Sequence, residues 1–276
     1  MVIRILIPLL CLGVLAGAAE SPPLPNILFA VGDNWAWPHA GTLGDPTVKT
    51  PTFDRIAREG LVFNFAFCPV PSCAGSRACL VTGRPAHQLK GAASLSGEFH
   101  KFDSFTELLE KEGYEVGYQG KGWGPGLYLE FGWKQNPAGR KYKSFEEFMQ
   151  KRDPDKPFFF WHGNTSVAQG KWKYDPEHWG EMAPDTVVVP PYLPDIREVR
   201  ETILAYYTGV QKQDQIFGDA VALLEKEKLL EDTMVIYTSD NGWQMPRGLA
   251  NCYDAGTRIP MAVRWGDRLE AGKETD

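Results

Sequence analysis

The sequence predicts an α/β fold, namely an α/β/α sandwich around a mainly parallel, mixed central sheet. Residues 25–32 and 233–239 are short apolar runs without period-two alternation, which is typical of strands buried on both faces of a parallel sheet. Helical segments separate such runs along the chain, and this alternation produces layered α/β architectures. The chain has 276 residues, 43% of them hydrophobic, which is enough for one large core.

The first part of the chain after residues 25–32 is predicted to form a helix, a strand and a second helix. Residues 50–60 begin with threonine and proline and end with glycine, which are the usual signals for the two ends of a helix. Residues 61–67 form the next strand. This strand leads into a loop and a helix near Cys73, in which apolar residues recur at helical spacing until Gly83.

The middle of the chain contains two more pairs of helix and strand. The predicted helices cover residues 103–112 and 144–151, and the strands that follow them cover residues 114–119 and 157–161. Residues 122–140 and 163–194 are rich in glycine, proline and aromatic side chains and are predicted to be long loops. Loops of this length inside a domain tend to be functional.

The last part of the chain is predicted to contain one long helix and two strands. The helix covers residues 195–230, with Gly209 or Gly218 as a point where it bends. The buried strand 233–239 follows, and residues 259–265 form the last strand. Residues 269–276 are expected to be a tail outside the fold.

Residues 1–19 have the pattern of a secretory signal peptide. Arg4 precedes an apolar run that ends in small residues, and cleavage is expected near Ala18 or Ala19. This run is too short, and too abruptly polar afterwards, for a membrane-spanning helix. The mature chain is therefore expected to be secreted or periplasmic, without a membrane anchor after signal cleavage.

The net charge and the cysteine spacing argue against two further classes, nucleic-acid-binding proteins and proteins with a cysteine zinc site. A net charge of −6 argues against a nucleic-acid partner, so an anionic substrate would need locally concentrated positive charge. Four cysteines remain after signal cleavage, at a spacing that fits no zinc site, and these are Cys68, Cys73, Cys79 and Cys252. One structural disulfide among them would suit an oxidising compartment, and its pairing stays open.

Two distant strands end in the same dipeptide, Asp33-Asn34 and Asp240-Asn241. The carboxyl ends of parallel strands form the usual site in such sheets, so neighbouring strands would bring these side chains together. Carboxylate and amide oxygens suit a hard cation, Ca²⁺ or Mg²⁺, although the dipeptide also marks simple turns. Cys73 at a helix start, with Arg77 in the same helix and Lys121 after another strand, adds an anion-binding group.

The chain resembles a known family, the type I sulfatases of the alkaline-phosphatase-like superfamily. It is most similar to their heparan N-sulfatase-like branch. The matching segments are PNILFAVGDN at 25–34, KTPTFDR at 49–55, PSCAGSR at 71–77, LVTGR at 80–84, GK at 120–121, TSDNG at 238–242 and YDAGTRIP at 253–260. They cover nearly the whole mature chain. The resemblance implies that residues 24–268 are the N-terminal catalytic domain and that the chain is C-terminally truncated, without the family's C-terminal subdomain.

The resemblance also implies a mechanism and a cofactor set. Cys73 stands where a maturation enzyme oxidises the family's cysteine to formylglycine, whose hydrate attacks the sulfur of a sulfate ester or sulfamate. Arg77 and Lys121 would neutralise charge on the transferring group. The residues at the calcium-ligand positions are Asp33, Asn34, Asp240 and Asn241. The family more often has aspartate where Asn34 stands, so weaker calcium binding is expected.

Three departures from the family pattern bear on activity. Gly75 replaces the proline of the cysteine motif. The segment that usually carries a histidine acid reads NTSVAQG at 164–170, and His162 lies several residues too early. Leu249 stands where a lysine is expected, with Arg247 two residues earlier as a substitute.

The leading hypothesis is therefore a calcium-dependent sulfatase that acts on a sulfated carbohydrate. The departures motivate an alternative from another class, a catalytically degenerate protein of this fold that binds sulfated glycans. A related phosphatase or phosphonate hydrolase is a third reading. Aromatic loops at residues 35–37, 123–133 and 172–179 offer side chains that could stack on sugar rings.

Overall fold

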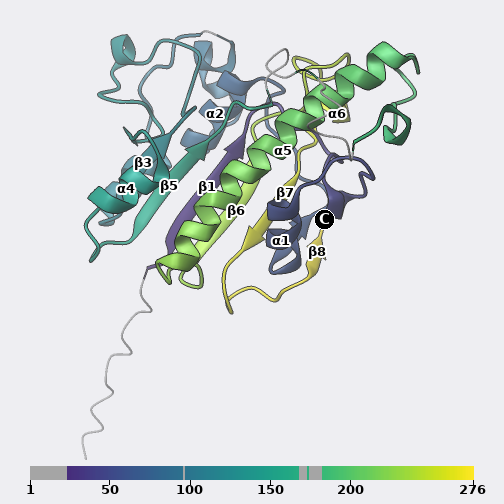
Figure 1. Cartoon of the computed structure of the whole chain (residues 1–276). Coiled ribbons are helices and arrows are strands. Elements are labelled where there is room, and N and C mark those ends of the chain that lie inside the picture. Colours follow the sequence, from purple (N-terminus) through teal and green to yellow (C-terminus); the bar gives the residue numbers. More distant parts are fainter. Residues whose placement is uncertain (1–23, 96, 168–172, 174–181) are drawn as a thin grey trace, which may run out of the picture.

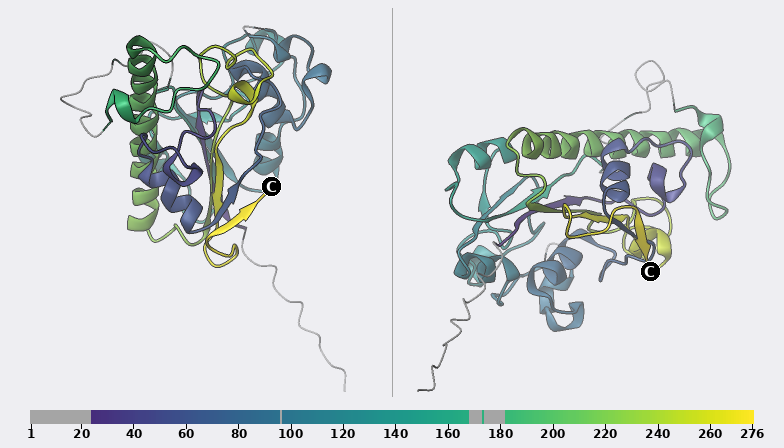
Figure 2. Two further views of the ribbon diagram at one scale, coloured as in Figure 1. Left: turned by 90° about the vertical axis from the view of Figure 1, so that its right-hand side faces the viewer. Right: turned by 90° about the horizontal axis from the view of Figure 1, so that it is seen from below.

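The computed structural model describes residues 24–95, 97–167, 173 and 182–276, and these form one eight-stranded sheet between two layers of helices. Both views of Figure 2 show α5 on one side of the sheet and the blue helices α2 and α3 on the other. The predicted α/β/α sandwich is confirmed. The predicted signal peptide and most of residues 168–181 lie outside the described residues.

The sheet is mixed but mainly parallel, as predicted. Its strands lie in the order β4-β3-β5-β1-β6-β7-β2-β8. Only β7 runs antiparallel to its neighbours β6 and β2. The strand bounds are β1 Asn26–Gly32, β2 Leu61–Phe63, β3 Glu115–Gln119, β4 Arg140–Lys141, β5 Phe158–Gly163, β6 Thr233–Ser239, β7 Met261–Arg264 and β8 Lys273–Thr275.

Three helices cover one face of the sheet, α1 Pro51–Arg58, α4 Phe145–Lys151 and α5 Arg197–Lys226 (Figure 1). The opposite face carries α2 Cys73–Thr82 and α3 Phe105–Lys111, and α6 Asp254–Thr257 is a single short turn. The described residues also form five 3₁₀ turns, Gly41–Leu43, Ala86–Gln88, Lys90–Ala93, Leu129–Phe131 and Pro184–Thr186. None of the helices in the described part of the chain is both long and apolar enough to cross a membrane.

The central strands are apolar throughout because both of their faces are covered. In β1, Leu28 and Ala30 pack into the core under α5, whereas Phe29 and Val31 pack into the core under α2. The phenylalanines of β5 divide in the same way, with Phe160 on the α5 side and Phe159 on the α2 side. Successive side chains of a strand point to opposite faces of the sheet. When both faces are buried, every position is therefore apolar, and the sequence shows no alternation of apolar and polar residues.

The predicted tail at residues 269–276 is wrong, because residues 273–275 form β8. This strand pairs in parallel with β2, and the Lys273 amide donates to the Gly60 carbonyl oxygen at 3.2 Å. Its sequence, Lys-Glu-Thr, has no apolar pattern that would predict a strand. The segment forms a strand because β2 has a free edge with unpaired backbone groups, to which it hydrogen-bonds. The predicted strand 61–67 is correspondingly shorter and ends at Phe63.

The long helix α5 is continuous through Gly209 and Gly218, so the predicted bend is not observed as an interruption. It also provides a cap that the sequence did not indicate. The Asp214 carboxylate accepts hydrogen bonds from the backbone amides of Thr52 at 2.8 Å and Phe53 at 2.9 Å, at the start of α1. Thr50, the expected cap, makes no side-chain cap hydrogen bond there.

Candidate active site

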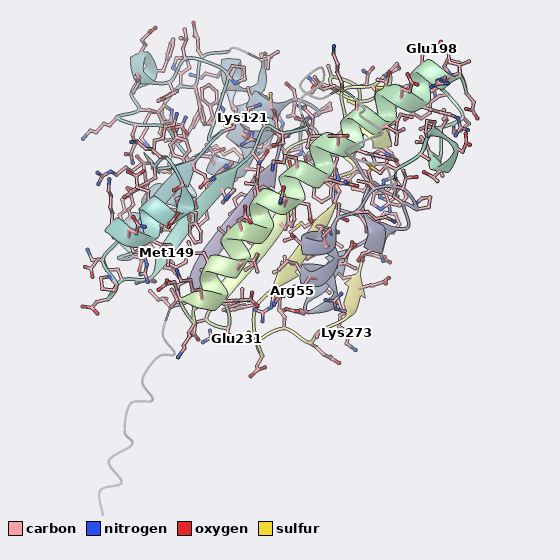
Figure 3. The ribbon with its side chains drawn as sticks, in the orientation of Figure 1. Arg55, Lys121, Met149, Glu198, Glu231 and Lys273 are labelled. Carbon is pink, nitrogen blue, oxygen red and sulfur yellow. The ribbon has the colours of Figure 1, made fainter. Side chains whose placement is uncertain are left out.

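The two Asp-Asn dipeptides meet because their strands are direct neighbours. In the parallel pair of β1 and β6, Gly32 lies opposite Ser239, so Asp33 and Asp240 follow at the same level of the sheet. Figure 3 shows Lys121 near this end of the sheet, while Glu231, which precedes β6, lies at the other end. The predicted convergence at the carboxyl ends of the strands is thus confirmed.

Cys73 is the first residue of α2 and lies against both carboxylates. Its sulfur and one oxygen each of Asp33 and Asp240 are all within 4.8 Å of one another, and all three residues are buried. The helix places its positive end at this point, where it favours a bound or developing negative charge. The sulfur is therefore located where an anion, a metal ion or both can be held.

Arg77 holds the site together from inside the protein. Its side chain is fully buried, and its Nε donates to Asp240 Oδ2 at 2.7 Å. Its Nη1 donates to the carbonyl oxygens of Lys121 at 2.7 Å and Gly122 at 3.1 Å. Its Nη2 donates to the Gly32 carbonyl oxygen at 3.3 Å, so the guanidinium fastens three strand ends to one another. Arg77 is thus a structural centre as well as a source of positive charge.

Lys121 completes the ring of charges. Its Nζ donates to Asp33 Oδ1 at 2.6 Å, and Arg77 Nη2 lies 3.7 Å from the same oxygen. Burial alone would raise the pKa of Asp33, but the positive charges of Arg77 and Lys121 outweigh it and lower that pKa. Asp33 is therefore a carboxylate at neutral pH.

Asp240 has the opposite tendency. Burial raises the pKa of its carboxyl group to about 6, Arg77 opposes this change, and the negative charge of Asp33 adds to it. Two carboxylates this close repel each other, so a cation between them would stabilise both in the charged form. The electrostatics of the pair therefore favour a bound metal ion.

Asn34 and Asn241 have different relations to a metal. The Asn241 Nδ2 group donates to Asn34 Oδ1 at 2.8 Å and to the Gly242 carbonyl oxygen at 2.7 Å. Asn241 Oδ1 is buried and has no hydrogen-bond partner. An unpartnered buried amide oxygen beside two carboxylates fits an oxygen-ligated cation such as Ca²⁺. Asp33, Asp240 and Asn241 are thus suited to hold it, while Asn34 orients Asn241.

An Asn34→Asp variant is expected to bind calcium about tenfold more tightly, because it adds a negative charge beside the ligands Asp33, Asp240 and Asn241. One oxygen of the new carboxylate can still accept the Asn241 hydrogen bond. Isothermal titration calorimetry would measure the change, with Asn251→Asp on the surface as the control. An unchanged dissociation constant would contradict a metal site beside Asn34.

The family comparison agrees with this geometry. A sequence model of the Sulfatase family matches residues 25–126 and 140–276. The chain belongs to the Sulfatase family. Among curated relatives, it is 31% identical over 295 residues to N-sulphoglucosamine sulphohydrolase of Homo sapiens, across 89% of this chain and 57% of that protein. It therefore spans little more than half of that relative's length.

Solved structures show the same fold. One is a protein in complex with its substrate D-glucosamine-2-N,6-O-disulfate, with a TM-score of 0.65, 18% identity, and coverage of 92% of this chain and 74% of that one. Another is the phosphonate monoester hydrolase of Agrobacterium radiobacter, with a TM-score of 0.68, 15% identity, and coverage of 91% and 70%. At these identities, the similarity shows that this chain shares its fold with both proteins.

The Gly75 departure from the sulfatase motif has a physical reason. A Cβ atom at Gly75 would lie 2.6 Å from the Ala93 carbonyl oxygen and 2.9 Å from Val70 Cγ1. The 3₁₀ turn Lys90–Ala93 thus packs directly on the start of α2. A proline ring would not fit at this position without moving that backbone.

The structure also shows where the residues at the other two expected departures lie. His162 packs edge-on against Phe217 of α5, with ring centroids 4.8 Å apart, so it lies on the sheet face away from α2. Leu249 donates its amide to the Trp243 carbonyl oxygen, and Ala250 donates to Pro71 beside the Cys73 loop. The exposed Arg247 guanidinium lies 5.1 Å from the ring centroids of both Tyr192 and Tyr253.

Three of the tryptophans in the predicted sugar-stacking loops are core residues instead. Trp35, Trp123 and Trp133 are buried, and only Trp37 of the described tryptophans in these loops is partly exposed. Trp172 and Trp179 lie outside the described residues. Trp161 was not among the predicted site residues, but its indole donates to the Lys121 carbonyl oxygen at 3.1 Å and so supports the lysine loop. Its position in a strand that ends at the same edge of the sheet was the available signal.

The buried His162 should make the free energy of unfolding depend on pH. Burial lowers its pKa to about 3, whereas the unfolded chain takes up the proton near the ordinary value of about 6.5. Stability is therefore retained above about pH 6.5 and lost as the pH falls toward 3, by at most about 1.4 kcal/mol per pH unit. Titratable side chains of α4 and α5 line the cavity beside it, Glu146, Asp219 and Lys226.

A His162→Gln variant is expected to lose less stability between pH 6.5 and 4 than the wild type does. Urea unfolding at a series of pH values would measure the slope. The exposed His87, replaced by glutamine in the same way, is the control. Equal slopes in wild type and His162→Gln would contradict the assignment.

Proposed function

We propose that this chain carries the catalytic site of a sulfatase that hydrolyses sulfate esters or sulfamates of carbohydrates. The observation that carries the proposal is the convergence of Cys73 with two carboxylates, a buried arginine and Lys121 on one end of the sheet. The family membership and the sulfated-sugar names of its relatives support this substrate class. Phosphate esters are the substrates against which sulfate esters should be compared, because a related phosphatase or phosphonate hydrolase is the alternative enzyme class.

The chemistry would need two groups that the chain's residues are suited to carry. Formylglycine made from Cys73 by a maturation enzyme would supply a hydroxyl nucleophile when hydrated. A calcium ion held by Asp33, Asp240 and Asn241 would supply positive charge to polarise sulfate oxygens. Asn34, the fourth position of the expected ligand set, keeps the Asn241 amide in place.

The remaining work falls to Arg77 and Lys121. Arg77 holds Asp240 and the backbone of residues 121 and 122, so it keeps the ligands and the lysine loop in register. The Lys121 ammonium is only partly buried and can also donate to an oxygen of an incoming sulfate group. Fixed donors of this kind stabilise charge that develops during transfer.

We also propose that the chain is exported to a secreted or periplasmic location, on the strength of residues 1–19. The maturation enzyme would have to act on the chain before it folds, because Cys73 is buried in the folded protein.

The experiment is sulfate release by protein co-expressed with a maturation enzyme. Glucosamine N-sulfate, an O-sulfated sugar and an aryl phosphate are the substrates, and peptide mass spectrometry reports the state of Cys73. Release of sulfate is expected, and Cys73→Ala should reduce its rate by several orders of magnitude. Cys79→Ala, in the same helix, should retain the activity.

Two results would overturn this proposal. Faster hydrolysis of the phosphate ester would assign the site to phosphoryl transfer. Retention on a sulfated-glycan column without sulfate release, with an unmodified Cys73 thiol, would favour a binding protein. The position of His162 on the opposite face and Leu249 in place of lysine are the observations that favour this second function.

A further inference from the structure

The state of Cys73 changes the chemistry of the metal site itself. As a thiol, Cys73 contributes a sulfur atom to a buried group with Asp33 and Asp240, whose ligand atoms are no more than 4.8 Å apart. Cys73 is a free cysteine in the structure. A cation between these atoms would thus meet one sulfur and two carboxylate oxygens.

A separate observation points to a cation at the same place. Asn241 Oδ1 is buried and has no partner, while the Nδ2 group of the same amide is used twice. Leaving a buried carbonyl oxygen without a donor is costly, and a metal ion satisfies it. Asn241 is therefore available as a fourth ligand.

The positive side chains bind one oxygen of each carboxylate. Lys121 binds Asp33 through Oδ1, and Arg77 binds Asp240 through Oδ2. Asp240 Oδ1 accepts the Asn34 amide at 3.1 Å, and the Asp33 and Asp240 carboxyl groups also lie within hydrogen-bond reach of each other. A cation would replace this carboxyl–carboxyl contact and bind an oxygen of each group, while each carboxylate keeps its ion pair.

We propose that the unconverted protein, with Cys73 as a thiol, binds a thiophilic divalent cation such as Zn²⁺ through Cys73, Asp33, Asp240 and Asn241. On binding, the metal–sulfur bond forms as the S–H bond breaks, and the proton passes to the solvent. Thiolate sulfur favours zinc over calcium, whereas an oxygen-only set favours calcium. Oxidation of Cys73 would remove the sulfur ligand and so shift the preference of the site toward calcium.

Zinc binding by the thiol form does not rest on the proposed function, whereas the shift toward calcium after oxidation of Cys73 does. It predicts that zinc binds only after the chain has folded, when the maturation enzyme can no longer reach the buried Cys73. It also predicts that unconverted chains, once folded, are occupied by a metal other than the one that the converted site prefers.

Cobalt(II) is the probe, because a cobalt–thiolate bond produces a near-ultraviolet charge-transfer band. Protein is produced without a maturation enzyme, and intact mass confirms the thiol. We expect the band in the wild type, its displacement by Zn²⁺, and its loss in Cys73→Ser. The apparent zinc affinity of Cys73→Ser should fall on the order of 100-fold.

Cys252→Ser is the matched control, because Cys252 is the exposed thiol of the described chain, and it should retain the band. Circular dichroism and the metal-free melting temperature of Cys73→Ser show whether that variant folds, and Cys73→Ala provides a second test. No band in the wild type, or a band that survives in Cys73→Ser, would overturn the inference. Sulfate release by converted protein is measured separately, so failure of either proposal is recognised independently.

Discussion

Calcium is expected to raise the melting temperature of the wild type, and an Asp240→Asn variant is expected to lose this rise. Asp240 offers a charged oxygen beside Asp33 and Asn241, and an amide in its place removes one of two negative charges. A ligand present at about 100 times its dissociation constant stabilises a folded protein by about 2.7 kcal/mol. Thermal unfolding with and without excess calcium would measure this difference directly.

The surface residue Asp232 provides the control for this experiment. An Asp232→Asn variant removes the same charge far from the site, at the amino end of β6, and should keep the full calcium response. A calcium response of normal size in Asp240→Asn would mean that the metal site has been assigned to the wrong residues. The comparison does not depend on activity, so it tests the site even without a substrate.

Replacement of Arg77 by methionine is expected to destabilise the fold by about 3–5 kcal/mol, which is typical when one partner of a buried ion pair is removed. Asp240 would lose its 2.7 Å partner. The carbonyl oxygens of Gly32, Lys121 and Gly122 would each lose a donor as well. Gly32 would keep the Asp240 amide and Lys121 the Trp161 indole as donors, whereas no other donor to Gly122 is described. Chemical denaturation would measure the loss.

Two further variants make the Arg77 prediction specific. Arg77→Lys keeps the charge, but one ammonium cannot reach all four hydrogen-bond acceptors of the guanidinium, so an intermediate loss is expected. Arg84→Met removes an exposed arginine just after the same helix and should change stability by no more than about 0.5 kcal/mol. Arg77→Met as stable as the wild type would refute a structural role for the guanidinium.

Part of the candidate site follows from local patterns. Asp33-Asn34 and Asp240-Asn241 were predicted to meet because each follows an apolar strand, and the neighbouring positions of β1 and β6 bear this out. The start of α2 at Cys73 also follows from its local sequence. The chemical roles of these residues stay predictions, because geometry shows which side chains meet and not what they do.

Other features depend on contacts that no local pattern encodes. Strand β5 could be predicted, but whether His162 faces α2 or α5 depends on the register and pleat of the assembled sheet. The burial of Trp35, Trp123 and Trp133 was likewise invisible, because an aromatic ring in a loop suits both a core and a sugar platform.

The sequence by itself determined the fold class, the strand ends that carry the site and the family, because apolar runs and short motifs are properties of adjacent residues. Only the tertiary structure decided that residues 273–275 extend the sheet, that Asp214 caps α1 and that Ala93 excludes a side chain at Gly75. Each of these joins segments that are distant in sequence or lack a pattern of their own. The assembled fold creates the free edge of β2 that binds β8, the unpaired amides of α1 that Asp214 accepts from, and the close backbone contact at Gly75.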